Sequence, residues 1–306
     1  MKKIVFEPDE EFNNQRIDKY LSAAMESMDY SRSYIQKLIK DNLVTVSDTV
    51  VKANYKVSCG DIVCVNVPDP KVLDVKPEDI PLDIIYEDED LLIVNKPKGM
   101  VVHPANGHYS GTLVNALLFH CKDNLSEING VLRPGIVHRI DMDTTGTLII
   151  CKNNATHNSI AEQLKVHSIT RRYRGIVHGV IKDDELTVDA PIARSKNDRK
   201  KMAIVPGGRE AVTHVKVLKR FKQYTYAEFE LETGRTHQIR VHMASIHHPL
   251  LGDAVYGPAK CSIKNLQGQT LHAMTIGFNH PRTGKYMEFS ADLPDYFEKL
   301  LKSLPE

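Results

Sequence analysis

Two segments near the N-terminus carry apolar residues at helical spacing. In QRIDKYLSAAM (15–25) the residues at i, i+3, i+4 and i+7 share one helix face: Ile17, Tyr20, Leu21 and Ala24. In YSRSYIQKLIKDN (30–42), where Ser31 is a suitable N-cap, the apolar face is formed by Ile35, Leu38 and Ile39. The pattern predicts two short amphipathic helices.

Strand-like patterns follow these helices. LVTV (43–46) and VVKANYKV (50–57) are short β-like runs, and CGDIVCVNV (59–67) alternates after a turn at Gly60-Asp61. The order of two helices and then strands predicts a small α/β domain over residues 1–67. Residues 68–82 contain four prolines, at Pro68, Pro70, Pro77 and Pro81, which is typical of an extended linker.

The remaining residues, 83–306, mix both periodicities. Strands are predicted at 91–95, 145–151 and 224–233, and helices at 111–121, 156–169 and 234–249. In the third strand Ala227, Phe229 and Leu231 alternate with Glu228 and Glu230, as in a half-solvated antiparallel strand. The irregular order of helices and strands predicts an α+β domain with a mixed, largely antiparallel sheet.

Composition adds few constraints. The 306 residues carry a net charge of +1, so any basic surface must be local. In 12–60 we count seven Lys/Arg against five Asp/Glu, which fits either a solvated helix face or an RNA-binding one. The five cysteines form no Cys-x-x-Cys pair, and no apolar run reaches the ~20 residues of a membrane span. No signal-peptide core follows the first residues, so we expect a cytoplasmic protein with reduced thiols and no membrane association.

The segment HRIDMDTTGTL (138–148) holds two carboxylates, Asp141 and Asp143. A metal-dependent phosphotransferase would use such a pair with Mg²⁺ at the end of a buried strand. Here His138-Arg139 interrupt the apolar run, and an alternating strand follows instead of a parallel βαβ series. The pattern therefore disfavours phosphotransfer.

An arginine-held aspartate is the second interpretation. In the helix predicted at 234–249, Thr236 and Arg240 stand at i and i+4, away from the apolar stripe. Arg240 is then available to a ligand or a carboxylate, and an arginine beside Asp141 would favour its ionised form. From spacing alone, an ordinary structural Asp–Arg salt bridge is the favoured interpretation, and the catalytic one stays open.

Five ordered blocks resemble RluA/RluD-type pseudouridine synthases. HRIDMDTTGTLIICKN (138–153) is similar to the family's H-R-L-D-x-x-T-[ST]-G-L motif, with Ile140 for Leu and Thr147 for the usual Leu. The other blocks are YEDEDLLIVNKPKGMVVHP (86–104), RPGIVHRID (133–141), RRYRGIVHG (171–179), and LETGRTHQIRVHMASIHHPLLGD (231–253) with YG (256–257) and LHA (271–273). The resemblance runs from about residue 12 to 290.

This resemblance implies an α+β catalytic domain with a central cleft that isomerises uridine in RNA to pseudouridine, without metal or organic cofactor. It implies that Asp141 is the catalytic aspartate and that Arg240 pairs with it. Tyr173 would stack on the target base and assist proton removal at C5, and Arg139 would fill the space that the flipped base vacates. Whether Asp141 acts as nucleophile or base stays open.

Residues 12–67 resemble the S4 RNA-binding domain. The matches to its helix motifs are Arg16, Ile17, Asp18, Tyr20, Leu21, Ser31, Arg32, Ser33, Ile35, Leu38 and Ile39; Ser47-Asp48 replaces the usual V-N-G-K turn. The resemblance implies a small α/β S4-like domain that binds an RNA backbone. The candidate RNA contacts are Arg16, Arg32, Lys37 and Lys40.

Three further expectations complete the prediction. The histidines at 237, 242, 247 and 248 lack the i, i+4 spacing of a helical zinc pair, so capping, core or RNA-contact roles are expected. The cationic loop 195–202 is either solvated or a phosphate contact. Large-subunit ribosomal RNA is the expected substrate, and transfer RNA is the alternative substrate. The alternative function is that of a non-catalytic RNA-binding assembly factor. We expect a monomer.

Overall fold

The computed structural model describes residues 2–25, 28, 32–67, 75–105, 107–122, 124–126, 128, 133–196, 198, 201–261, 263 and 266–306. Two compact units, Met1–Val72 and Leu73–Glu306, divide the chain. The Ser31 cap and the first part of the expected linker, 68–74, lie outside the described residues. The domain boundaries expected at 1–67, 68–82 and 83–306 stay a prediction. No helix in the described chain is long and apolar enough to cross a membrane.

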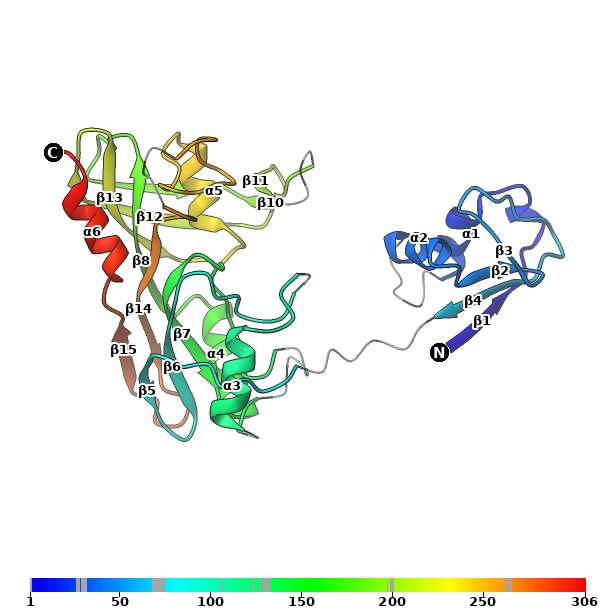
Figure 1. The fold of residues 1–306 in the computed structure, drawn as a ribbon, viewed down its shortest axis with the longest axis horizontal. Coiled ribbons are helices and arrows are strands. Elements are labelled where there is room, and N and C mark those ends of the chain that lie inside the picture. The colour runs from blue at the N-terminus through cyan, green and yellow to red at the C-terminus, as the bar shows by residue number, and fades with distance from the viewer. Residues whose placement is uncertain are drawn as a thin grey trace. The chain divides into compact units, whose positions relative to one another are not determined.

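The first unit packs two helices on a small sheet (Figure 1). Its elements are β1 (Lys2–Phe6), a 3₁₀ turn (Glu10–Phe12), α1 (Ile17–Ala24), α2 (Arg32–Lys40), β2 (Val44–Val46), β3 (Thr49–Val50) and β4 (Val63–Val67). The strands pair in the order β1-β4-β2-β3, all antiparallel. The apolar helix positions predicted from spacing form its core with the sheet valines.

Two expectations for this unit were wrong in detail. The strand expected at 50–57 is only the end of β3, and residues 51–57 run as turns with one isolated bridge, Arg16 to Lys56. β1 was not predicted, and it adds an edge strand beside β4. The short β2–β3 hairpin has Ser47 and Asp48 in its turn, both with positive φ (46° and 63°).

The second unit is built on one nine-stranded sheet with the order β5-β6-β7-β14-β8-β13-β12-β9, in which β15 also pairs with β14. Its strands are β5 (Ile84–Glu87), β6 (Leu91–Lys96), β7 (Thr145–Cys151), β8 (Thr170–His178), β9 (Glu185–Asp189), β12 (Val212–Arg220), β13 (Tyr224–Leu231), β14 (Leu271–Asn279) and β15 (Tyr286–Ser290). A separate hairpin joins β10 (Ile192–Arg194) to β11 (Met202–Ile204). Among the described strand pairs, β7–β14 is the single parallel one. The predicted α+β class with a largely antiparallel sheet is confirmed.

Helices cover both faces of this sheet, as Figure 1 shows: α3 (Leu113–Cys121), α4 (Asn154–Lys165), α5 (Gln238–Ser245) and α6 (Asp295–Ser303). α3 packs on Leu92, Val94, Leu148 and Ile150, whereas α4 packs on the alternate residues Leu91, Ile93, Ile149 and Cys151. Because successive strand residues point to opposite faces, α3 and α4 lie on opposite sides of β6 and β7. By the same alternation, α5 and α6 lie on opposite sides of β8 and β13.

Two predicted details of the second unit need correction. The helix expected over 234–249 is shorter, because α5 begins at Gln238 and ends at Ser245, so Thr236 precedes it. The second part of the linker expected at 68–82 contacts the second unit: Val75 is buried in the α3 core, and the Asn115 side-chain amide donates to the Lys76 carbonyl.

Candidate active site

Asp141 stands in a loop that leads into β7. The Thr144 amide donates to the Asp141 carbonyl at 3.1 Å, and the adjoining Met142 carbonyl accepts from both Lys96 and the Gly99 amide. Lys96 is fully buried, and its ammonium also donates to the carbonyls of Pro97 and Met100. Burial lowers the pKa of Lys96 to about 7, but three carbonyl acceptors match the three donors of the charged ammonium. Lys96 therefore fixes the loop that carries Asp141, a structural role.

Arg240 is held by the turn before α5. His237 takes a left-handed conformation (φ 57°), and the buried Gln238 side chain accepts from the Thr233 hydroxyl and the Arg235 amide. These bonds fix the start of the helix, so Arg240, on its first turn, reaches Asp141. Arg240 Nη1 donates to Asp141 Oδ2 at 2.9 Å. The structure thus brings together the two residues that the resemblance paired.

A second carboxylate that the sequence analysis did not single out also contacts Arg240. Asp253 accepts from Arg240 Nε at 2.7 Å and from Nη2 at 2.9 Å, and it also accepts from the backbone amides of Val255 and Tyr256. Burial acts to raise the pKa of Asp253, but the Arg240 hydrogen bonds and the amides hold it below its usual range. Asp253 ends the quoted block 231–253, so its motif position was the available signal.

The expectation that Arg240 points off the core was wrong. Only 6% of Arg240 is exposed. Burial opposes its charge, but the bonds to Asp253 and Asp141 raise the pKa of Arg240 above its ordinary value. The Tyr256 ring lies 5.1 Å from its guanidinium carbon, which adds a cation–π contact. Arg240 is a permanent, immobile cation beside Asp141.

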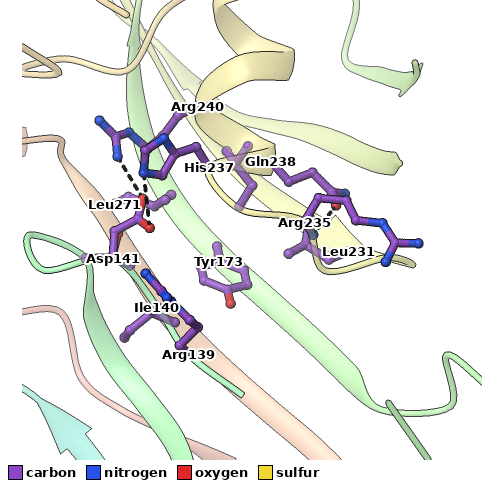
Figure 2. Close-up of a pocket in the computed structure, with 12 residues that line it drawn as sticks. Arg139, Ile140, Asp141, Tyr173, Leu231, Arg235, His237, Gln238, Arg240 and Leu271 are labelled. Atoms are coloured by element: carbon purple, nitrogen blue, oxygen red, sulfur yellow. Dashed lines mark hydrogen bonds and ion pairs between the residues drawn. The ribbon is translucent and has the colours of Figure 1, made fainter. Parts of the chain in front are cut away.

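Tyr173 lies on β8 where two hydrophobic clusters meet, the one under α3 and the one under α5. Figure 2 shows its ring beside Asp141 and Arg139, and shows Arg240 and His237 directed at the Asp141 carboxylate. Burial raises the pKa of Tyr173, and the Asp141 charge adds to this effect, whereas Arg171 opposes it. Its hydroxyl is therefore neutral at physiological pH, and it has no hydrogen-bond partner within the described chain.

Two adjoining pockets open at these residues. A small one of about 60 Å³ lies between Asp141, Tyr173 and Arg240, and a larger one of about 610 Å³ adjoins it. The residues common to both are Arg139, Asp141, Tyr173, Leu231, Arg235 and His237. Arg139 is exposed, while Figure 2 shows the Arg235 guanidinium pointing away from Asp141. A carboxylate, a fixed cation and an aromatic ring at one pocket suit nucleophilic or base chemistry on an uncharged ring.

Asp143 does not join Asp141 in either pocket. Its carboxyl packs against Gly268, where an added Cβ would overlap it. Asp141 and Asp143 are therefore not paired for a bridging magnesium ion, so the geometry of these two residues argues against phosphotransfer.

Another acidic cluster, formed by Asp88, Asp90 and His280, has ligand atoms close enough for a metal. However, Arg282 donates to both Asp90 oxygens at 2.6 and 2.7 Å, and His280 contacts Asp88 at 2.9 Å. An arginine already neutralises this cluster, which makes it a structural contact between the β5–β6 turn and the β14–β15 turn.

The remaining candidate residues are spread over both units. Lys37 and Lys40 are exposed on α2, and the Arg32 side chain lies outside the described part. Arg16 is engaged in an ion pair, because its Nε donates to the buried Asp18 at 2.9 Å. His242 is a core residue bonded to Thr213 and Ala190, and His248 contacts the His178 carbonyl. In the loop 195–202, Lys196 and Lys201 are described, whereas Arg199 and Lys200 lie outside.

Comparison with known proteins gives consistent matches. A family model described as RNA pseudouridylate synthase matches residues 90–245, and an S4 domain model matches residues 15–63. The chain is 53% identical to an uncharacterized RNA pseudouridine synthase of Bacillus subtilis, over 99% of both chains. It is 47% identical to the ribosomal large subunit pseudouridine synthase D of Zymomonas mobilis, over 96% of this chain and 95% of the other. The solved human RNA pseudouridylate synthase domain containing 1 covers 78% of this chain and 99% of its own, with TM-score 0.56 and 21% identity, and shares the fold.

Proposed function

The chain belongs to the RNA pseudouridylate synthase family, and we propose from this premise that it isomerises specific uridines of large-subunit ribosomal RNA. It is an isomerase with an N-terminal S4 domain. The observation that carries the proposal is the Asp141–Arg240 contact of 2.9 Å at the wall of a pocket that Tyr173 also lines. The relative named for the ribosomal large subunit, 47% identical, supports the choice of RNA. Such a substrate implies action in the cytoplasm.

Asp141 is the proposed catalytic carboxylate. In the reaction the N1–C1′ bond of uridine breaks, the uracil turns, a C5–C1′ bond forms, and the proton on C5 leaves while N1 gains one. A carboxylate starts this sequence either by attack on C1′ or by removal of a ribose proton. Arg240 keeps the Asp141 carboxylate oriented for either step, because its Nη1 donates to Oδ2 at 2.9 Å.

We propose that Tyr173 contacts the flipped base and that Arg139 occupies the gap that the base leaves in the RNA stack. A flipped uracil at Asp141 would lie against the Tyr173 ring, since both line the small pocket. The raised pKa of Tyr173 makes tyrosinate scarce at neutral pH, which favours stacking over direct proton removal. Arg139 is exposed at the entrance, where it can enter the gap left in the RNA stack. Arg16, Arg32, Lys37 and Lys40 are the proposed backbone contacts of the S4 domain.

The decisive experiment assays pseudouridine in unmodified transcripts of large-subunit ribosomal RNA and transfer RNA. We expect wild-type protein and Asp143→Asn to modify the ribosomal transcript, and Asp141→Asn to give no detectable product. Asp143→Asn is a matched control because it removes the same charge two residues away. Retained activity in Asp141→Asn would overturn the catalytic assignment, and modification of the transfer RNA alone would overturn the choice of substrate.

The alternative of a non-catalytic assembly factor is tested by the same assay. That alternative predicts ribosomal RNA binding by the wild type with no product.

Arg240→Lys tests the role of the guanidinium group, because lysine keeps the charge but cannot contact Asp141 and both Asp253 oxygens at once. We expect about a hundredfold lower kcat for Arg240→Lys with RNA affinity preserved. A kcat within twofold of the wild type would show that the forked geometry of Arg240 is dispensable.

A further inference from the structure

Arg171 is a buried arginine for which the described chain provides no carboxylate. It is 7% exposed, and Nη2 donates to the carbonyls of Glu232 at 2.8 Å and Leu231 at 3.5 Å. Its Nε has no hydrogen-bond partner among the described residues. An arginine cannot shed its charge in a protein, so this site holds a positive charge for which the described residues provide no counter-charge.

The neighbouring arginines on the same strand differ. Arg172 contacts Glu230 at 3.4 Å, and Arg174 contacts Glu228 at 3.3 Å, each across the β8–β13 pair. They lie on the opposite face of the sheet, because successive strand residues alternate. Arg171 shares its face with Tyr173, two residues along. The strand thus pairs the arginines that face away from the active site and leaves unpaired the one on its side.

Arg171 forms part of the wall of the larger pocket, of about 610 Å³. The described cations lining that pocket are Arg139, Lys165, Arg171 and Arg235, and Asp141 is the one acid among its lining residues. Asp141 is already bound to Arg240. The Arg171 guanidinium also packs on Gly234, where a Cβ would fall 2.6 Å from Nη1. A glycine at 234 therefore leaves room for the guanidinium at the pocket wall.

A buried cation without a counter-charge is unfavourable unless a ligand supplies the anion. The guanidinium fork matches phosphate oxygens, and arginine is suited to partly buried phosphate contacts. The pocket adjoins the one at Asp141 and shares Tyr173 with it, so an RNA strand whose uridine enters the small pocket passes the large one. We propose that the larger pocket binds a backbone phosphate of the RNA strand next to the target uridine, with Arg171 as the buried anchor and Arg235 at the rim.

This inference rests on the proposed function for the identity of the RNA, but its main test does not require activity. The probe is a fluorescein-labelled oligouridylate, whose equilibrium binding is measured against KCl concentration. Losing one phosphate contact lowers the magnitude of the negative slope of log K against log [salt] by about 0.7 for a single strand. We expect this decrease for Arg171→Gln and recovery of the wild-type slope for Arg171→Lys.

Arg172→Gln is the matched control, since it removes the same charge from the adjacent residue on the other face. We expect its binding slope to equal that of the wild type. In the pseudouridine assay on the ribosomal transcript, Arg171→Gln should raise KM about tenfold with kcat changed less than threefold. The melting temperature of Arg171→Gln distinguishes a phosphate-binding role of Arg171 from a role in folding. If Arg171 binds phosphate, exchange of its uncompensated buried charge for an amide should leave the melting temperature unchanged or raise it.

An unchanged slope in Arg171→Gln, or an equal decrease in Arg172→Gln, would overturn the phosphate site. So would a lower melting temperature together with an unchanged slope, which would assign Arg171 to folding alone. If the wild type modifies no RNA, the proposed function fails, whereas the oligouridylate slopes still decide whether the pocket binds phosphate.

Discussion

Arg240 and Asp253 form a buried ion pair in which two guanidinium nitrogens contact two carboxylate oxygens, at 2.7 and 2.9 Å. This pair uses Nε and Nη2 and leaves Nη1 for Asp141. Since the Asp253 carboxylate is also fixed by two backbone amides, the guanidinium plane has one orientation. Asp253 therefore positions Asp141 through Arg240 without lining either pocket.

The first prediction concerns Asp253→Asn. The amide keeps the shape of the carboxyl but removes its charge and directs an N–H₂ group toward a guanidinium nitrogen. Breaking one partner of a buried pair costs about 3–5 kcal/mol, so urea unfolding should show a loss of this order. We also expect kcat to fall about 10- to 100-fold with a smaller change in KM, because Arg240 no longer holds Asp141 in place.

The matched control for this variant is Asp184→Asn, whose carboxylate also contacts an arginine, Arg220, but is 86% exposed. Exposed pairs contribute about 0–1 kcal/mol, so both stability and kcat should stay near wild type. A kcat for Asp253→Asn equal to that of the control would contradict the positioning role.

The second prediction concerns Gly146→Ala at the parallel pair of β7 and β14. Gly146 has φ 108°, and an added Cβ would overlap the Ala273 carbonyl. Both the backbone conformation and the close approach exclude a side chain. We expect a loss of about 2–4 kcal/mol in unfolding free energy.

The same variant should lower kcat, because β7 begins four residues after Asp141. Gly284→Ala is the control for the backbone effect: Gly284 also has positive φ (68°) but has open space around it. Its loss should be about 1 kcal/mol, with activity preserved. Equal losses in the two variants would show that the contact with Ala273 does not matter.

Local patterns in the sequence identified many elements correctly. The strand predicted at 145–151 is β7, and the helix positions Ile17, Leu21 and Ile35 are all fully buried. The helix positions follow from burial on one face, which repeats every 3.6 residues, whereas β7 is buried at all of its residues and was identified by a continuous apolar run. Neither pattern reports pairing between distant segments, so the parallel contact of β7 with β14, more than a hundred residues away, was not predicted.

In the active site, too, local sequence identified residues but not their tertiary environment. Asp141 and Arg240 were identified from motif position and lie in contact, but the environment of Arg240 was not predicted. The prediction placed Arg240 beside Thr236 on the solvent face of one helix. In the structure His237 is left-handed and α5 begins at Gln238, so Thr236 lies outside the helix and the i, i+4 relation does not apply. Asp253 and Arg171 were missed because burial of a charged group depends on tertiary packing, which the one-dimensional pattern does not contain.

The third prediction is a pH dependence set by His138. The Ile149 amide donates to His138 Nε2 at 3.0 Å, and burial, aided by the Arg171 charge, lowers the pKa of His138 to about 3 from its ordinary 6.5. As pH falls below 6.5 the unfolded chain binds this proton before the folded chain does. His138 therefore contributes stability above pH 6.5 that is lost progressively as the pH falls toward 3, at up to about 1.4 kcal/mol per pH unit.

His138→Gln should accept the same amide without titrating, so its unfolding free energy should fall less steeply between pH 6.5 and 4. Some slope remains, because burial also lowers the pKa of His103, to about 4. His108→Gln, at an exposed position, is the control and should keep the wild-type slope. Parallel pH profiles for His138→Gln and wild type would disprove the assignment.

The fourth prediction concerns the turn between β2 and β3. Ser47 and Asp48 both have positive φ, the conformation of a type I′ hairpin, in which Asn-Gly is preferred. Glycine adopts this conformation without the strain of a Cβ, so Asp48→Gly should stabilise the first unit by about 0.5–1 kcal/mol. Amide exchange protection of β4 (Val63–Val67) reports on this unit alone and should rise about two- to fivefold. Asp41→Gly, at a residue without positive φ, serves as the control. It relieves no strain, so the amide exchange protection of β4 should stay equal or fall. A rise in this protection equal to that of Asp48→Gly would contradict the turn as the cause.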